Sequence, residues 1–235
     1  MLFLLYNHFS TDWHRRVLPA FSGGKAKYSG RDRTFPGLPQ RRCERKGDSR
    51  VHALILADGE YRTELYESLC GRLIDRLAQT GYEAEVEVID GSLRPCMGCF
   101  GCWVRTPGEC VIRDGMADIN RRYMQSDAVV FLSPVVFGQC SANIKNVLDR
   151  TLPHMLPFFE RRADGSTGHP PRYKRYPLVW MIGYGTDLED AEIRLFRDIT
   201  QKHRPEVGVA VCTGESDFDG VERLFAAHGA KRTEA

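Results

Sequence analysis

From Val51 onward, the hydrophobic positions of the chain switch between the period of a strand and the period of a helix. The run VHALILA, which begins at Val51, is short and apolar, as a buried strand is. The next segment, 61–79, places apolar residues at helical spacing, and Gly81 follows as a stop signal. Residues 83–90 (EAEVEVID) alternate in the manner of a strand. The apolar positions of the predicted helix are Leu65, Leu69, Leu73, Ile74 and Leu77.

The alternation of strand and helix continues to the end of the chain. We expect strands over 128–133, 178–183 and 207–213, where Val, Ile and Leu dominate. We expect helices over 114–124, 141–149, 187–202 and 219–228. The segment 153–176 is rich in Pro, Gly and Arg and is predicted to be an irregular connection.

This order of elements predicts the fold class. Nearly continuous apolar strands that alternate with amphipathic helices indicate a parallel sheet covered by helices on both faces. Five such strands suit an α/β, doubly wound, three-layer sandwich, and we see no internal repeat or second domain. In such sheets, ligands bind at the carboxyl ends of the strands, near the point where the strand order reverses.

The first fifty residues differ from the rest in composition. Residues 1–50 lack periodicity and carry 11 Lys or Arg against 4 Asp or Glu. We therefore expect a basic, disordered N-terminal extension, either a solvated tail or an arm that binds a partner. The domain is then 51–235, whose 22 basic and 27 acidic residues offer no basic patch for nucleic acid. The apolar opening MLFLLY is too short for a signal peptide or a membrane span, so we expect a cytoplasmic protein.

Four of the eight cysteines lie within fifteen residues, in the predicted insertion 92–113 and its CMGCFGCWVRTPGEC segment. Clustered thiols in a reducing cytosol are more often ligands or redox groups than structural disulfides. The spacing of Cys96, Cys99 and Cys102 is compact and ferredoxin-like, and the turn at 106–108 could return Cys110 as a fourth ligand. A [4Fe–4S] cluster and metal-free thiols are the leading alternatives, with zinc and a disulfide behind them.

Three loops at the carboxyl ends of the predicted strands should face one crevice. They are residues 58–63, 133–138 and 183–186. The first and second of these lead into helices, whose N-terminal amides suit a phosphate group.

The second loop carries a resemblance to a known family. Its sequence SPVVFG (133–138), followed by Asn-Ile-Lys at 143–145 and Leu-Asp-Arg at 148–150, resembles the flavin loop and following helix of the flavodoxin-like NAD(P)H-dependent FMN reductase family. The cysteine segment, followed by Asp-Gly-Met at 114–116, is similar to the insertion of the iron–sulfur flavoprotein branch and its relatives. The resemblance covers roughly residues 51–185.

The resemblance implies a flavodoxin-like sandwich with the strand order 2-1-3-4-5, with FMN as cofactor and NAD(P)H as electron donor. The phosphate of FMN would lie at the first loop and the isoalloxazine ring along the second. The glycines of the third loop would allow the ring to approach the backbone closely. The implied cofactor-binding residues are Gly59, Arg62, Thr63, Ser133, Pro134, Val135, Val136, Phe137, Gly138, Gly183 and Gly185. The implied metal ligands are Cys96, Cys99, Cys102 and Cys110.

The first loop departs from the family pattern. The family usually has a sequence close to Gly-Ser-Pro-Arg there, whereas this chain has ADGEYRTE over 57–64. Asp58, Glu60 and Glu64 would repel a phosphate dianion by about 1 kcal/mol apiece if they lie close to it, and Arg62 would offset part of that repulsion.

Two functional hypotheses follow. The first is an FMN-dependent NAD(P)H oxidoreductase or electron-transfer flavoprotein, acting on a small-molecule or protein acceptor. Because the flavin carries the hydride chemistry, we predict no catalytic side chain. Such a protein is expected to form a homodimer or homotetramer, with the aromatic stretch 156–159 at the interface. The alternative is a scaffold that has lost FMN and binds a metal or a partner.

Overall fold

A computed structural model describes residues 51–163 and 165–229 of this protein. All of them belong to one compact unit. The predicted basic extension 1–50 lies outside the described residues.

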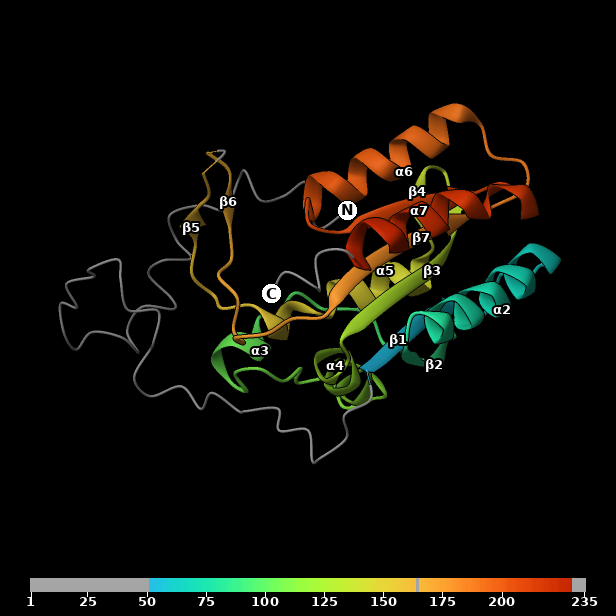
Figure 1. Cartoon of the computed structure of the whole chain (residues 1–235). Helices are drawn as coiled ribbons and strands as arrows, with labels where there is room; N and C mark the ends of the chain where they lie inside the picture. Colours follow the sequence, from blue (N-terminus) through green and yellow to red (C-terminus); the bar gives the residue numbers. More distant parts are fainter. Residues whose placement is uncertain (1–50, 164, 230–235) are drawn as a thin grey trace, which may run out of the picture. The chain divides into compact units, whose positions relative to one another are not determined.

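The described part of the chain alternates strands and helices, as its hydrophobic pattern predicts (Figure 1). The strands are β1 (Val51–Asp58), β2 (Tyr82–Ile89), β3 (Ala128–Val136), β4 (Gln139–Cys140), β5 (Glu160–Arg161), β6 (Thr167–Gly168), β7 (Leu178–Tyr184) and β8 (Gly208–Cys212). The α-helices are α2 (Glu64–Gln79), α3 (Gly101–Val104), α4 (Met116–Gln125), α5 (Ala142–Asp149), α6 (Asp190–His203) and α7 (Phe218–Gly229).

Five parallel strands form the main sheet in the order β2-β1-β3-β7-β8. Numbered along the chain as parallel strands, this order is 2-1-3-4-5, so the flavodoxin-like prediction is confirmed. The short strand β4 pairs antiparallel with the end of β3. The order reverses between β1 and β3, which therefore form the topological switch point.

Helices cover both faces of the sheet, and each face has its own hydrophobic core (Figure 1). On one face, α2 and α7 pack on residues such as Ile55 and Trp180. On the other face, α4, α5 and α6 pack on residues such as Leu54 and Phe131. Since successive side chains of a strand point to opposite faces, the run 128–132 is buried along its whole length in β3.

Several boundaries differ from the sequence prediction. Helix α2 begins at Glu64 instead of residue 61, because the hydroxyl of Thr63 accepts the amide of Tyr66 as an N-cap. Strand β3 runs on to Val136, through the first residues of the predicted second loop. The predicted irregular connection 153–176 contains the two-stranded hairpin of β5 and β6, which extends from the body on the side of α3 (Figure 1).

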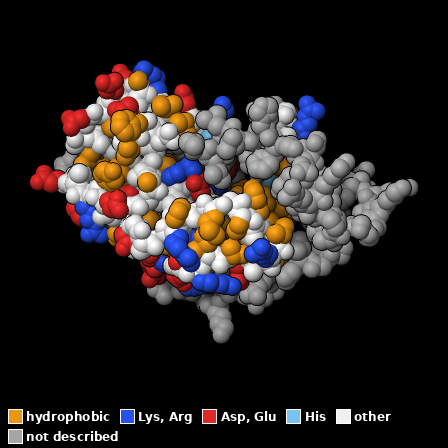
Figure 2. All heavy atoms as spheres, turned by 180° about the vertical axis from the view of Figure 1, so that it is seen from behind, with side chains coloured by type: hydrophobic (Ala, Val, Ile, Leu, Met, Phe, Trp, Pro, Cys, Tyr) orange, Lys and Arg blue, Asp and Glu red, His pale blue; other side chains and the backbone are white. Residues whose placement is uncertain are grey.

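The described surface carries both acidic and basic side chains (Figure 2). On the face shown in Figure 2, acidic and basic side chains are interspersed, and hydrophobic side chains form separate patches between them. Within the described ranges, no helix combines the length and apolar character needed to cross a membrane.

Gly208 in β8 tests the packing of the sheet against α7. A Cβ atom there would lie 2.5 Å from Leu224 Cδ1 and 2.8 Å from Trp180 Cδ1. We expect Gly208→Ala to lower the free energy of unfolding by about 1–3 kcal/mol through overpacking. Gly71→Ala is the control, because a Cβ atom at that exposed helical position meets nothing within 4 Å. Urea unfolding should show Gly71→Ala stabilised by about 0.5–1 kcal/mol. Equal stability of the two variants would contradict the packing described for β8.

Candidate functional site

A cleft opens at the carboxyl ends of the strands, at the switch point. It has a volume of about 190 Å³ and receives residues from all three predicted loops. It is lined by Tyr61, Thr63, Pro134, Val135, Val136, Tyr184, Gly185 and Thr186. A larger hollow of about 370 Å³ is lined by Ala78, Gly81, Tyr82 and Glu83, at the opposite end of the sheet. The position of the smaller cleft agrees with the rule for ligand binding in open α/β sheets.

The end of β3 forms one wall of the cleft with Pro134, Val135 and Val136. Beyond it, Phe137 and Gly138 form the turn into β4 and both have positive φ, 49° and 71°. Primed hairpin turns have this backbone shape, and a non-glycine residue rarely adopts it. The Phe137 side chain is 86% exposed at the tip of this turn.

Ser133, although predicted with this loop, is fully buried beneath it. Its hydroxyl donates to the carbonyl of Pro134 at 2.9 Å and accepts the amide of Ser141 at 2.9 Å. The side chain thus fixes the chain that enters α5 and does not line the cleft.

The two glycines after β7 lie in different environments. Gly185 lines the cleft, and its amide donates to the carbonyl of Cys212 at 3.1 Å. Gly183 is buried in the sheet, where a Cβ atom would lie 2.7 Å from Val135 Cγ2 and 2.9 Å from the Phe196 ring. Gly183 therefore allows α6 to pack closely behind the β3 wall.

Of the three residues predicted in the first loop, Thr63 lines the cleft. Gly59 packs against β2, and its amide donates to the carbonyl of Ile89 at 2.8 Å. The guanidinium of Arg62 lies over the ring of Tyr66, 5.8 Å from its centroid, along α2. The cation that the sequence offers to a phosphate therefore contacts an aromatic ring of the helix that follows the loop.

Asp58, the last residue of β1, lies at the base of the first loop. Its side chain is 0% exposed, and Oδ1 accepts the amides of Glu60 at 2.8 Å and Tyr61 at 3.3 Å. Its other oxygen accepts the hydroxyl of Ser141, the N-cap of α5. The carboxylate therefore links the loop after β1 to the helix that follows β3.

Tyr184 closes the side of the cleft between β7 and the first loop. Its hydroxyl donates to the carbonyl of Tyr61 at 2.8 Å. Burial raises the pKa of Tyr184, and the negative charge of Asp58 adds to the shift. The phenol therefore stays protonated and holds its hydrogen bond throughout the neutral range.

The cleft fits a planar ring system better than it fits a phosphate. Its walls are largely apolar, and Gly185 permits close approach of a ligand to the backbone. The Glu60 and Tyr61 amides, by contrast, already donate to Asp58. The first turn of α2, which follows this loop, carries the carboxylates of Glu64 and Glu67.

The four clustered cysteines lie in and around α3. Cys102 is buried, Cys99 is exposed, and Cys96 and Cys110 are half-buried; all four are free thiols. Burial raises the pKa of Cys102 to about 12, and the charges of the other three thiols add to it. In the part of the chain that the structure describes, no three His, Cys, Asp or Glu side chains are gathered closely enough to hold a metal ion. The all-thiol donor set suits a cluster, but this arrangement does not form a ligand shell.

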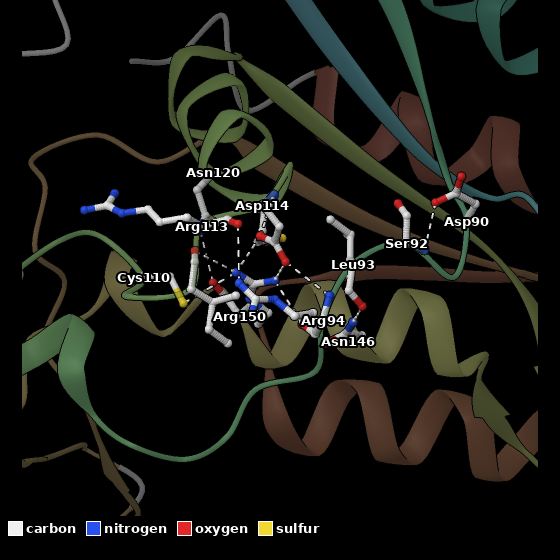
Figure 3. Close-up of polar contacts among 12 residues, drawn as sticks. Asp90, Ser92, Leu93, Arg94, Cys110, Arg113, Asp114, Asn120, Asn146 and Arg150 are labelled. Atoms are coloured by element: carbon white, nitrogen blue, oxygen red, sulfur yellow. Dashed lines mark hydrogen bonds and ion pairs between the residues drawn. The ribbon is translucent and has the colours of Figure 1, made fainter.

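Arg150, at the end of α5, is a structural centre that the sequence did not reveal (Figure 3). It is 1% exposed, and its guanidinium donates to both carboxylate oxygens of Asp114, at 2.6 and 2.8 Å. It also donates to the carbonyl of Arg94 at 2.9 Å and to Cys110 Sγ at 3.5 Å. The neighbouring Asp149 pairs with Lys145 and not with Arg150. Arg150 thereby ties both ends of the cysteine insertion to the helix that follows the cleft.

Trp103 anchors the middle of the insertion. Its indole Nε1 donates to the carbonyls of Leu152 and Met155, both at 3.1 Å. Its ring stacks with Phe100 at a centroid distance of 5.2 Å and packs on His169 at 4.8 Å. The insertion therefore contacts the connection that carries the β5–β6 hairpin.

Comparisons with known proteins agree with this fold and cleft. The NAD(P)H:quinone oxidoreductase from Methanothermobacter marburgensis superposes with a TM-score of 0.53 at 12% sequence identity, over 77% of this chain and 95% of that one. At this identity the likeness concerns the fold alone, and it places the chain among the flavodoxin-like α/β proteins.

The sequence comparisons show a similarity to one family over part of the chain. Residues 60–163 match the family described as NADPH-dependent FMN reductase. An iron–sulfur flavoprotein of Archaeoglobus fulgidus is 37% identical over 131 residues, which are 48% of this chain and 59% of that protein. Another from Methanocaldococcus jannaschii is 33% identical over 93 residues, which are 39% of this chain and 47% of that protein. This part of the chain is therefore similar to the NADPH-dependent FMN reductase family and to curated iron–sulfur flavoproteins. The matches span about half the length of those relatives.

The buried ion pair of Asp114 and Arg150 predicts a pH-dependent stability. The hydrogen bonds from Arg150 are the largest cause that lowers the pKa of Asp114. A lowered pKa stabilises the fold above the usual carboxyl value of about 3.9, and this contribution is lost as the pH falls through the lowered pKa. We expect Asp114→Asn to lose about 3 kcal/mol at neutral pH, and less as the pH falls below about 4.

Urea unfolding of both proteins between about pH 7 and pH 3 measures this difference. Asp75→Asn, a charge change at an exposed position of α2, is the control and should leave stability nearly unchanged at every pH. A deficit for Asp114→Asn that stays constant down to the lowest pH would contradict the assigned role of the pair.

Proposed function

We propose that this chain is an FMN-dependent NAD(P)H oxidoreductase that passes electrons to a small-molecule or protein acceptor. The observation that carries the proposal is the cleft at the β1–β3 switch point, whose β3 wall lies within the segment that matches the reductase family. The curated relatives are known as iron–sulfur flavoproteins, which supports the proposal further.

When bound, the flavin supplies the hydride and single-electron chemistry, so the residues of the chain have to bind and orient it. Pro134, Val135 and Val136 offer an apolar wall and backbone groups along the ring system. Gly185 and Thr186 form the wall that β7 contributes, and Tyr184 holds it against the first loop. These groups exclude water from one side of the ring and fix its orientation.

Flavin binding to the cleft tests the proposal. We expect the purified protein to quench the fluorescence of added flavin and to consume NADH or NADPH once flavin is present. Val136→Trp should weaken flavin binding by at least about tenfold, since an indole ring takes up much of so small a cleft. Ile74→Trp, on the exposed side of α2, adds the same ring outside the cleft and should bind flavin normally.

A protein that binds neither oxidised nor reduced flavin would overturn the proposal. It would favour the alternative of a scaffold that binds a metal or a partner. Equal loss of binding in the two Trp variants would place the flavin somewhere other than this cleft.

The finer proposal concerns the cysteine insertion, for which we propose a [4Fe–4S] cluster. The similarity to iron–sulfur flavoproteins and the all-thiol donor set support the cluster, while the separation of the thiols among the described residues opposes it. We therefore assign no step to the cluster. Protein purified without oxygen should contain about four iron atoms per chain, and Cys96→Ala should lose most of them. Iron-free protein that binds flavin would leave the insertion as metal-free thiols.

The expected homodimer or homotetramer stays a prediction. Within the stretch 156–159, Leu156 is buried, whereas Phe158 and Phe159 are exposed. Sedimentation of the wild type and of Phe159→Asp would show whether this pair of rings takes part in assembly.

A further inference from the structure

The first loop of the cleft contains an internal anion at the place where a flavin phosphate would be expected. Asp58 is the last residue of β1, and its carboxylate is wholly buried at the base of the loop. This inference rests on the proposed function, because it concerns which part of a flavin the cleft recognises.

Asp58 occupies donors that a phosphate would otherwise use. In α/β proteins of this type, a phosphate at the end of the first strand is bound by loop amides and by the N-terminus of the next helix. Here the amides of Glu60 and Tyr61 donate to Asp58, and the amide of Gly59 donates to Ile89 of β2. The loop is therefore closed by its own carboxylate, without an external anion.

The positive end of the α2 dipole is also offset by acidic side chains of this chain. Thr63 accepts the amide of Tyr66, and Glu64 and Glu67 place two carboxylates in the first turn of α2. Acidic side chains at this position interact favourably with the helix dipole and offset the attraction of the helix for an incoming anion.

No basic side chain among the described residues neutralises the negative charge of Asp58. The described residues give Asp58 two amides and a hydroxyl as partners, but no basic side chain. Arg62 lies over the ring of Tyr66 and is not among the residues that line the cleft. The charge of Asp58 also reaches into the cleft, since it contributes to the raised pKa of Tyr184 in the cleft wall.

We propose that the cleft recognises the ring system of a flavin and not its phosphate, with Asp58 as the residue that determines this specificity. Riboflavin and FMN are then equivalent ligands. The first loop does not fit the phosphate of FMN, because Asp58 accepts the loop amides and Arg62 lies over Tyr66.

Titration of the protein with riboflavin and with FMN, followed by flavin fluorescence, tests the proposal. The wild type should bind the two flavins with dissociation constants within about threefold of each other. Asp58→Asn keeps the side-chain shape and an oxygen for the loop amides but removes the charge. It should bind FMN about tenfold more tightly than the wild type and leave riboflavin binding unchanged.

Asp75→Asn is the matched control, since it removes one negative charge from an exposed position of α2 outside the cleft. It should leave the affinities for both flavins as they are in the wild type. Glu64→Gln gives a second test if Asp58→Asn fails to fold, because Glu64 is exposed in the first turn of α2. It should strengthen FMN binding by about twofold to threefold without changing riboflavin binding.

Two results would overturn the inference: wild-type protein that binds FMN more than about a hundredfold more tightly than riboflavin, or an Asp58→Asn variant with an unchanged ratio of the two affinities. Failure to bind either flavin is a different result, because it contradicts the proposed function itself.

Discussion

The burial of β3 on both faces is the constraint on which the rest of the structure depends. Its run 128–132 is wholly excluded from solvent, with β1 on one side and β7 on the other. A central strand of this kind requires helices on both faces and parallel neighbours, so the three loops that follow β1, β3 and β7 meet at one edge. The cleft is a direct result of this geometry, and its chemistry depends on what each loop places there.

The strands and helices could be predicted because their signal is local. The apolar strands 51–57 and 128–133, and the leucines of α2, determine their elements by periodicity alone, and the strand order followed from the resemblance to a known family. The boundaries were less accurate, since they depend on single contacts such as the N-cap at Thr63 and on the turn at Phe137. The β5–β6 hairpin has strands of two residues each, too short to show any period.

The candidate site was predictable in its location but not in its details. The sequence identified Asp58 as an unfavourable neighbour for a phosphate, but it could not show that this carboxylate turns inward to accept the amides of its own loop. Arg150 and Asp114 lie 36 residues apart, so their contact depends on the packing of α5 against the insertion. Long-range polar contacts of this kind have no local signature in a single sequence.

The contacts of Arg150 also determine how the insertion moves. A loop attached at its two ends would open and close independently of the domain, whereas here one buried guanidinium joins Arg94, Cys110 and Asp114 to α5. Opening the insertion would leave that guanidinium and its carboxylate unpaired, at a cost of several kcal/mol. The amides of this segment should therefore exchange with solvent hydrogen together with those of α5, as one cooperative unit.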